Sequence, residues 1–237
     1  MGGGVFIKRC DDTANRFELD ARRRPVYASG MADEYTLYSM QESGNCYKPR
    51  LLLHLLGLSF RLIETDPREG ATKRPEFRAL NPNGRVPFLI LPDGRMLAES
   101  NAMLLYLGEG TKYLPADRYE RALVLQWLFF EQYEHEPQIA VARAWLHTYP
   151  DRKVKVTPEQ IAGWQQKGGH ALGVMESRLA DHDWLVGSGY SVADIALYAY
   201  THVAHEGGFD LGRYPGVSRW LARIAAMPRH VPLEWRP

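Results

Sequence analysis

The sequence predicts an α/β domain followed by an all-helical domain, and three observations indicate this organisation. Short apolar runs typical of strands alternate with helical runs between residues 35 and 107, a pattern typical of α/β folds. A hairpin that begins with a proline follows within this region, at residues 86–98. After residue 117 the apolar residues recur with a helical period to near the end of the chain.

The composition of the 237-residue chain is that of an ordinary globular protein, with 45% hydrophobic and 24% charged residues. A net charge of +1 gives no indication of nucleic-acid binding. No apolar run approaches the roughly 18 residues of a membrane span, so we expect no membrane partner. The two cysteines, Cys10 and Cys46, lack metal-ligand spacing. We therefore expect no metal, and a cytoplasmic location in a reducing compartment.

Residues 1–33 mix basic and acidic side chains without a clear period. A secretory signal needs an apolar stretch and a transit peptide is poor in acids, so neither description fits. We expect a loosely ordered N-terminal extension. Because a strand is expected soon after Met31, we hypothesise that the native protein starts there; an intact mass that includes residues 1–30 would contradict this.

Residues 34–110 are expected to form the first domain, with the element order β-α-β-α-β-β-α. Its first helix runs from Cys46 to Gly57, with Pro49 in the first turn, where the missing N–H does no harm, and a glycine cap at the end. The turn signal Asn81–Gly84 precedes the proline-led strand. The other expected elements are strands at 35–39, 60–64, 86–91 and 96–98, a loop with a short helix at 68–80, and a helix at 100–107.

Residues 111–117 are expected to be a linker and residues 118–237 a helical domain. The first helix of this domain is long and amphipathic, and Pro137 should kink it or mark a break. Ser191 and Asp194 have the spacing of a capping box. Helices are expected at 118–148, 157–180, 195–205 and 215–227.

Two features between Asn81 and Asn101 also predict a binding site. Val86-Pro87 places a proline at the first position of a strand, where an N–H is not needed. Glu99-Ser100 opens an apolar helix, and a helix N-terminus can bind a carboxylate through its free N–H groups. A plain hairpin and a plain helix cap explain the same residues without any ligand.

In combination, these motifs resemble the cytosolic glutathione S-transferase family over residues 35 to about 228. The resemblance implies a thioredoxin-like N-terminal domain, an all-helical C-terminal domain and a homodimer. It also implies that glutathione is a co-substrate and that the second substrate is a small hydrophobic electrophile. The motifs that carry it are Asn81-Pro82-x-Gly84-x-Val86-Pro87, Glu99-Ser100 and Ser191-x-x-Asp194.

The resemblance also implies which residues bind glutathione. Val86 would pair its backbone with the cysteinyl unit, and Pro87 would be the cis proline that presents it. Glu99 would hold the γ-glutamyl ammonium group and Ser100 the γ-glutamyl carboxylate. The implied set is completed by Lys73, which would lie near the glycyl carboxylate, and by Arg85, which stands where many relatives have a glutamine.

The catalytic group is expected in the loop that begins the first helix. The resemblance to the serine-type classes, such as theta and phi, places a hydroxyl donor for the glutathione thiolate at Ser43. Asn45 could donate through its amide. Cys46 lies at a helix N-terminus, which lowers a thiol pKa, and would instead imply mixed-disulfide chemistry. Tyr38 falls one position from the tyrosine-type motif, and one position reverses the facing on a strand.

The sequence therefore predicts a glutathione transferase with a role in detoxification. Two alternatives stay open: a non-catalytic glutathione-binding stress or regulatory module, and a Cys46-dependent thiol transferase. The second substrate is expected to lie against the long helix that begins at Arg118. Candidate lining residues on that helix are Trp127, Phe130, Tyr133, Glu134 and Arg143.

Overall fold

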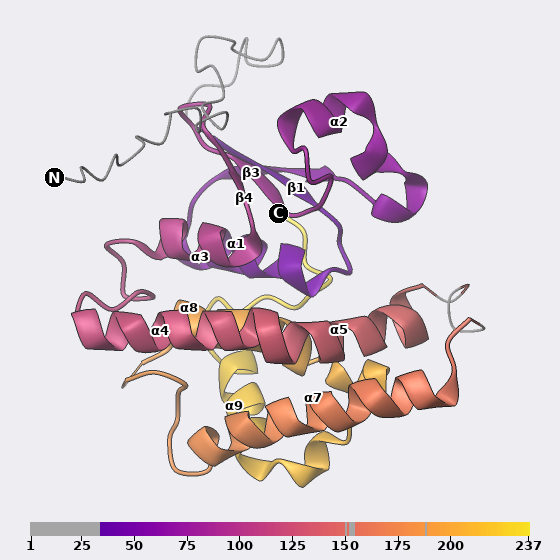
Figure 1. Cartoon of the computed structure of the whole chain (residues 1–237). Helices are drawn as coiled ribbons and strands as arrows, with labels where there is room; N and C mark the ends of the chain where they lie inside the picture. The colour runs from indigo at the N-terminus through magenta and orange to yellow at the C-terminus, as the bar shows by residue number, and fades with distance from the viewer. Residues whose placement is uncertain (1–33, 150, 152–154, 188) are drawn as a thin grey trace, which may run out of the picture. The chain divides into compact units, whose positions relative to one another are not determined.

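The computed structural model describes residues 34–149, 151, 155–187 and 189–237. The predicted extension and the hypothesis of a start at Met31 lie outside these residues. A four-stranded sheet with its helices comes first, and a helical region follows it (Figure 1). This arrangement confirms the predicted fold class, a thioredoxin-like region followed by an all-helical one. The limits assigned to the two domains and to the linker stay predictions.

The strands form one mixed sheet in the order β2–β1–β3–β4. β1 runs parallel to β2 and antiparallel to β3, and β3 runs antiparallel to β4. β3 is shorter than the expected strand at 86–91, because Pro87 has no N–H to contribute to the ladder. The strands are β1 (Tyr35–Ser39), β2 (Phe60–Glu64), β3 (Phe88–Ile90) and β4 (Met96–Ala98).

Helices α1 and α3 lie between the sheet and the helical region, whereas α2 lies on the opposite side of the sheet (Figure 1). α1 contacts both α3 and α8, which explains why nearly all of its residues are buried. The start of α1 is therefore placed where the two regions meet. The elements are α1 (Gly44–Leu56), the 3-10 turns η2 (Pro67–Glu69) and η3 (Ala71–Lys73), α2 (Pro75–Leu80) and α3 (Ser100–Gly108).

The first helix of the second region extends from Arg118 to Thr148 and contains two π-helical turns. The first π turn ends immediately before α5, in which Pro137 occupies the first turn. A proline cannot donate the α-helical hydrogen bond to the preceding turn, so the predicted break takes the form of a π turn. The segments are α4 (Arg118–Phe130), η4 (Glu131–His135), α5 (Glu136–Arg143) and η5 (Ala144–Thr148).

Helix α8 forms the centre of the helical region, and all of its residues are buried. Ser191 and Asp194 form the predicted capping box, and Asp194 also accepts the Trp220 indole N–H at 2.9 Å. α8 ends at Thr201, short of the expected His205, and 3-10 turns follow it. The remaining helical elements are α7 (Pro158–Leu179), α8 (Val192–Thr201), η6 (Ala204–Gly207), η7 (Leu211–Arg213) and α9 (Pro215–Ala225).

Candidate active site

Ser43 caps the N-terminus of α1 and borders a cavity. Its Oγ accepts the Cys46 N–H at 3.3 Å, and its half-buried side chain lines a cavity of about 170 Å³. The Asn45 N–H donates to the Tyr200 hydroxyl at 3.3 Å, which brings α8 against this end of α1. Because the N-terminus of a helix carries partial positive charge, Ser43 places a hydroxyl beside a cavity where an anion is favoured.

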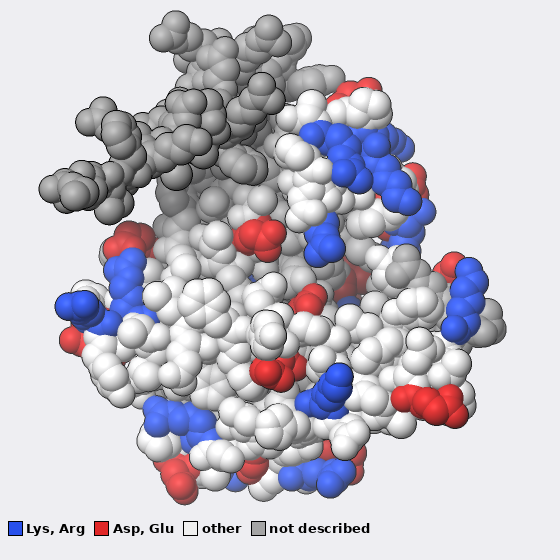
Figure 2. Space-filling view, in the orientation of Figure 1, with Lys and Arg blue, Asp and Glu red and all other residues white. Residues whose placement is uncertain are grey.

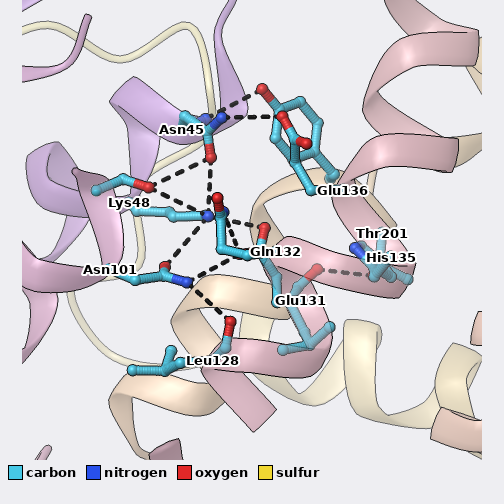
Figure 3. Close-up of polar contacts among 12 residues, drawn as sticks. Asn45, Lys48, Asn101, Leu128, Glu131, Gln132, His135, Glu136 and Thr201 are labelled. Atoms are coloured by element: carbon cyan, nitrogen blue, oxygen red, sulfur yellow. Dashed lines mark hydrogen bonds and ion pairs between the residues drawn. The ribbon is translucent and has the colours of Figure 1, made fainter. Parts of the chain in front are cut away.

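Asn45 lies in the first turn of α1 and joins three parts of the chain (Figure 3). Its Oδ1 accepts hydrogen bonds from Lys48 Nζ at 2.8 Å and from Ser100 Oγ at 3.3 Å. Its Nδ2 donates to Glu136 Oε1 at 3.2 Å, across to α5. The structure thus brings two of the predicted site residues, Asn45 and Ser100, into direct contact.

Lys48 and Glu131 form an ion pair that is closed to solvent, with 0% exposure of both side chains and 2.8 Å between Nζ and Oε1. Nζ also donates to Ser100 Oγ and Asn101 Oδ1, each at 3.3 Å. Asn101 Nδ2 in turn donates to Glu131 Oε2 at 3.0 Å. Buried charges are tolerated when they are paired and hydrogen-bonded in this way, so the pair anchors α1, α3 and η4 to one another.

Glu136 is a half-buried carboxylate at the edge of the cavity beside Ser43. Burial raises its pKa, and the nearby Glu131 carboxylate raises it further. Lys48 and Arg85 act in the opposite direction. A carboxyl group with a raised pKa in a cleft is a feature of functional sites.

Cys46 is fully buried and points away from solvent. Its Sγ accepts the Met40 N–H at 3.3 Å. Burial raises the pKa of the thiol, and this effect exceeds the lowering by the hydrogen bonds and by Arg50. The environment therefore favours a neutral thiol that packs in the core, in contrast to the exposed and electropositive setting of a reactive cysteine.

The hairpin has the backbone features that were predicted for it. The Val86–Pro87 peptide bond is cis. Asn81 holds the preceding turn, because its Nδ2 donates to the Arg85 carbonyl at 2.8 Å. Val86 is half-buried and Pro87 is buried, and both lie immediately before β3.

The start of α3 places Glu99 and Ser100 on either side of the helix boundary. Glu99 is exposed and has φ of 68°, outside the regions usual for residues with a side chain. Ser100 is 5% exposed, and its hydroxyl is held by Lys48 and Asn45. The backbone N–H groups at this helix start can bind the carboxylate of a ligand. The exposed carboxylate of Glu99 can bind an ammonium group.

Lys73 and Arg85 are exposed, on η3 and in the segment before β3 respectively. Figure 2 shows basic side chains gathered over the part of the molecule around α2. Arg74 and Arg78 are also exposed there. This surface attracts anions and repels cations. The positive charge of Arg85 also lowers the pKa of Glu136, which lies at the edge of the cavity.

Of the five residues proposed to line the second-substrate pocket, only Arg143 is among those that border the 170 Å³ cavity. Trp127 is buried and donates to the Leu185 carbonyl, so it packs in the core. Phe130 packs beside it, whereas Tyr133 and Glu134 are exposed. These four residues do not border this cavity. Trp127 and Phe130 lie in α4, before the π turn η4, whereas Tyr133 and Glu134 lie within η4, where the facing of the helix changes. The residues that border the cavity are Met40, Ser43, Glu136, Ala140, Val141, Arg143, Ala144, Thr148, Tyr149 and Tyr200.

Sequence reasoning missed four polar residues of this site: Lys48, Glu131, Glu136 and Tyr200. One signal was present in the sequence. Lys48 follows Asn45 by three residues in a helix that is rich in leucine, and a charged side chain on a mostly buried helix needs a partner. The partner itself was not visible, because Glu131 is 83 residues away along the chain. The described residues contain no cluster of potential metal ligands.

Two family models match the chain. The glutathione S-transferase N-terminal domain matches residues 42–109 and the glutathione S-transferase C-terminal domain matches residues 162–228. Among curated proteins, the disulfide-bond oxidoreductase YfcG of Escherichia coli K12 is 34% identical over 191 residues, which cover 78% of this chain and 87% of YfcG. No helix in the described part of the chain has the length and hydropathy to cross a membrane.

Solved structures agree with these matches. A glutathione S-transferase from Pseudomonas fluorescens Pf-5 is 50% identical, with a TM-score of 0.81, and the match covers 84% of this chain and 98% of that one. Ure2p in complex with S-hexylglutathione is 27% identical, with a TM-score of 0.74, over 83% of this chain and 96% of that one. Both domain types, a relative at 34% identity and the shared fold lead to one conclusion: the chain belongs to the glutathione S-transferase family and is a glutathione transferase.

Proposed function

We propose that this transferase activates the glutathione thiol with Ser43 and Asn45 and transfers glutathione to a small hydrophobic electrophile. The observation that carries the proposal is the placement of both residues at the N-terminus of α1, with Ser43 on the wall of a cavity. A free thiol with a pKa of about 8.5 is only a few per cent ionised at neutral pH. A hydroxyl donor and a helix N-terminus lower such a pKa by roughly 2 units, or about 2.7 kcal/mol.

In this proposal, the hairpin and the start of α3 hold the rest of glutathione. The backbone of Val86, presented by the cis Pro87, pairs with the cysteinyl unit. Glu99 binds the γ-glutamyl ammonium group, and the start of α3 at Ser100 binds the carboxylate. Lys73 and Arg85 attract the glycyl carboxylate, and the basic surface around α2 supports this role because glutathione is an anion.

The cavity beside Ser43 receives the electrophile. A cavity of roughly 150 Å³ in another protein accommodates benzene, so about 170 Å³ suits a compound with one ring. The aliphatic side chains of Met40, Ala140 and Val141 give it an apolar wall. Binding of S-hexylglutathione by Ure2p supports an apolar site next to the sulfur in this fold.

Substitution of Ser43 and Asn45 tests the proposal. Conjugation of 1-chloro-2,4-dinitrobenzene is measured for the unmodified protein, Ser43→Ala and Asn45→Ala, together with calorimetric titration of glutathione. We expect each variant to lose at least tenfold in kcat/KM, about 1.4 kcal/mol, while glutathione still binds. Unchanged turnover in both variants would remove these residues from the mechanism. Glutathione binding by the unmodified protein without turnover of the electrophile would favour the non-catalytic glutathione-binding alternative.

Disulfide exchange is a second candidate reaction, and the identity of the relative YfcG as a disulfide-bond oxidoreductase favours it. The glutathione thiolate would attack one sulfur of a substrate disulfide, form a mixed disulfide and release the other sulfur as a thiolate. The burial of Cys46 supports a route that does not use a protein thiol. Turnover of a mixed-disulfide substrate by two variants separates the glutathione-thiolate route from a protein-thiol route. Loss of turnover in Ser43→Ala supports the first route, and loss in Cys46→Ser supports the second.

A homodimer in the cytoplasm completes the proposal. The exposed large apolar side chains of the described residues include Tyr106 on α3, Phe129 on α4 and Tyr133 on η4, and exposed apolar surface supports an interface. Sedimentation at micromolar concentration should give twice the 27.0 kDa of the chain, and Phe129→Glu should lower this mass. A single-chain mass for the unmodified protein would contradict the dimer. A cytoplasmic location is supported by the unpaired thiol of Cys46.

A further inference from the structure

The amide of Asn45 is held between a positive and a negative side chain (Figure 3). Lys48 Nζ donates to Oδ1 at 2.8 Å, and Nδ2 donates to Glu136 Oε1 at 3.2 Å. A lysine ammonium group can only donate and an ionised carboxylate can only accept. The two contacts therefore fix which end of the amide carries the oxygen, and they leave the second Nδ2 hydrogen for another acceptor.

The lysine end of this clamp is rigid. Lys48 is fully buried, and besides Asn45 it contacts Ser100, Asn101 and Glu131. The Glu131 carboxylate pairs directly with Lys48 Nζ at 2.8 Å and compensates its charge. The Asn45 amide is therefore held from two sides: Lys48 and Ser100 donate to Oδ1, and Glu136 accepts from Nδ2.

Glu136 connects the clamp to the cavity. It borders the cavity together with Ser43 and Tyr200, and it comes from α5 of the helical region. The groups that act on its charge are Lys48 on α1, Arg85 before β3 and Glu131 on η4, and the Glu136 charge itself raises the pKa of Tyr200 on α8. Arg143, on the same cavity wall, is already paired with Glu206.

We propose that Glu136 is a positioning residue: it orients the Asn45 amide so that the free Nδ2 hydrogen points beside Ser43, toward the place of the glutathione sulfur. The inference rests on the proposed function, since it assumes a thiolate at this end of α1. Glu136 acts through Asn45 and needs no contact with the substrate. Its role requires an acceptor at Oε1, which an ionised carboxylate supplies and which a glutamine can also supply.

For the loss of Glu136, the positioning role and the charge alone predict opposite changes in the thiol pKa of bound glutathione. A negative charge near a thiol raises the thiol pKa, so removal of the charge by itself should lower it. Loss of the acceptor should instead free the Nδ2 end of the Asn45 amide and weaken its hydrogen bond to the thiolate. We therefore expect Glu136→Ala to raise the pKa of bound glutathione by about one pH unit, the tenfold effect of one hydrogen bond to a charged group, and Glu136→Gln to leave it unchanged or lower.

The test measures the thiol pKa of protein-bound glutathione by thiolate absorbance between pH 5 and 9, without any turnover. It uses the unmodified protein, Glu136→Gln, Glu136→Ala, Asn45→Ala and the Glu136→Ala/Asn45→Ala double variant. Glu134→Gln is the matched control, because it removes an exposed carboxylate from the neighbouring η4 turn. Thermal unfolding of each variant, with glutathione absent, shows that it is folded.

The positioning role predicts that the double variant is no worse than Asn45→Ala alone, since Glu136 acts only through Asn45. Equal lowering of the thiol pKa by Glu136→Gln and Glu136→Ala would overturn the inference, and so would additive effects of the two single alanine variants. Failure of the proposed function would be distinct: the thiol pKa of glutathione bound to the unmodified protein would equal that of free glutathione.

Discussion

Glu99 combines an exposed side chain with a left-handed backbone. Its φ is 68° and its ψ is 116° at the residue that precedes α3. A residue with a side chain in a sparsely populated region costs about 1–3 kcal/mol and is found most often at functional sites. Because the carboxylate is exposed and packing does not require it, its proposed contact with the γ-glutamyl ammonium group offers a reason for a glutamate at this position.

Two substitutions of Glu99 separate the backbone cost from the carboxylate. Glu99→Gly and Glu99→Ala both remove the carboxylate, so we expect both to weaken glutathione binding at least tenfold, about 1.4 kcal/mol, in calorimetric titration. Glycine adopts positive φ without steric cost. In denaturant unfolding, Glu99→Gly should therefore be about 1 kcal/mol more stable than Glu99→Ala. Equal stability would show that the backbone conformation carries no cost, and unchanged binding would exclude the carboxylate contact.

Cys46 is expected to contribute to packing and not to turnover. Cys46→Ala removes a buried sulfur and its contact with the Met40 N–H. We expect a loss of about 1 kcal/mol in the free energy of unfolding, with kcat/KM for conjugation and for disulfide exchange within twofold of the unmodified protein. Loss of disulfide exchange alone would instead support the thiol-transferase alternative.

At the scale of elements, the approach of α1 to α8 depends on Gly44. A Cβ at this position would lie 2.7 Å from the Ala199 carbonyl oxygen and 2.7 Å from the Tyr200 ring. Both contacts are closer than real Cβ atoms make, so the start of α1 can rest on α8 only without a side chain here. The same close approach brings the Tyr200 hydroxyl to 3.3 Å from the Asn45 N–H.

Gly44→Ala should therefore destabilise the protein, by about 1–3 kcal/mol for overpacking, and should lower kcat/KM because the start of α1 must shift. Gly173→Ala is the matched control. Gly173 lies inside α7, and a Cβ at this position would have no neighbouring atom within 4 Å, so alanine should stabilise the helix by up to about 1 kcal/mol. Denaturant midpoints and conjugation kinetics check both variants; equal effects on stability would contradict the close-contact argument.

The sequence predicts elements well where a local signal defines them. Gly57 marks the end of α1, and Ser191 with Asp194 marks the start of α8. The prediction that Pro49 lies in the first turn was wrong, because α1 begins at Gly44, capped by Ser43, and Pro49 lies inside the helix. The π turn after Phe130 has no such signal beyond Pro137, and it moves the facing of every later residue on the helix. For this reason Tyr133 and Glu134 were expected in the pocket and are exposed, whereas Glu136 was not expected and borders it.

The same limit applies to the candidate site as a whole. Val86-Pro87 and Glu99-Ser100 are short contiguous motifs, and these can be recognised without knowledge of the fold. The contacts of Asn45 with Glu136 and of Lys48 with Glu131 join positions 91 and 83 residues apart. These contacts form only in the folded chain, so the sequence alone does not reveal them.

At the scale of the whole molecule, this packing also determines how stability depends on pH. His135 is fully buried on η4, where its Nε2 is 2.9 Å from the Thr201 hydroxyl of α8. Burial lowers the pKa of His135 to about 4, an effect that exceeds the opposing one of Glu131 and is reinforced by Lys48. The folded state therefore holds a neutral imidazole, while the unfolded chain takes up a proton near pH 6.5.

The direction in which stability changes with pH follows from this difference in proton binding. Below pH 6.5 the unfolded state binds more protons, so the stability that is complete above pH 6.5 is lost as the pH falls toward 4. The buried Asp194 and the half-buried Glu136 have raised pKa values, which act in the opposite direction. A comparison with a variant therefore isolates the histidine better than the total stability of the unmodified protein does.

We expect the free energy of unfolding of the unmodified protein, relative to His135→Gln, to fall by about 2 kcal/mol between pH 7 and pH 5. Glutamine keeps a polar partner for Thr201 and cannot take up the proton. Denaturant unfolding of both proteins at pH 7, 6 and 5 measures the difference, with His205→Gln as a control because His205 is exposed. A difference that stays constant over this range would mean that His135 does not bind a proton on unfolding, and that its burial between η4 and α8 is less complete in solution.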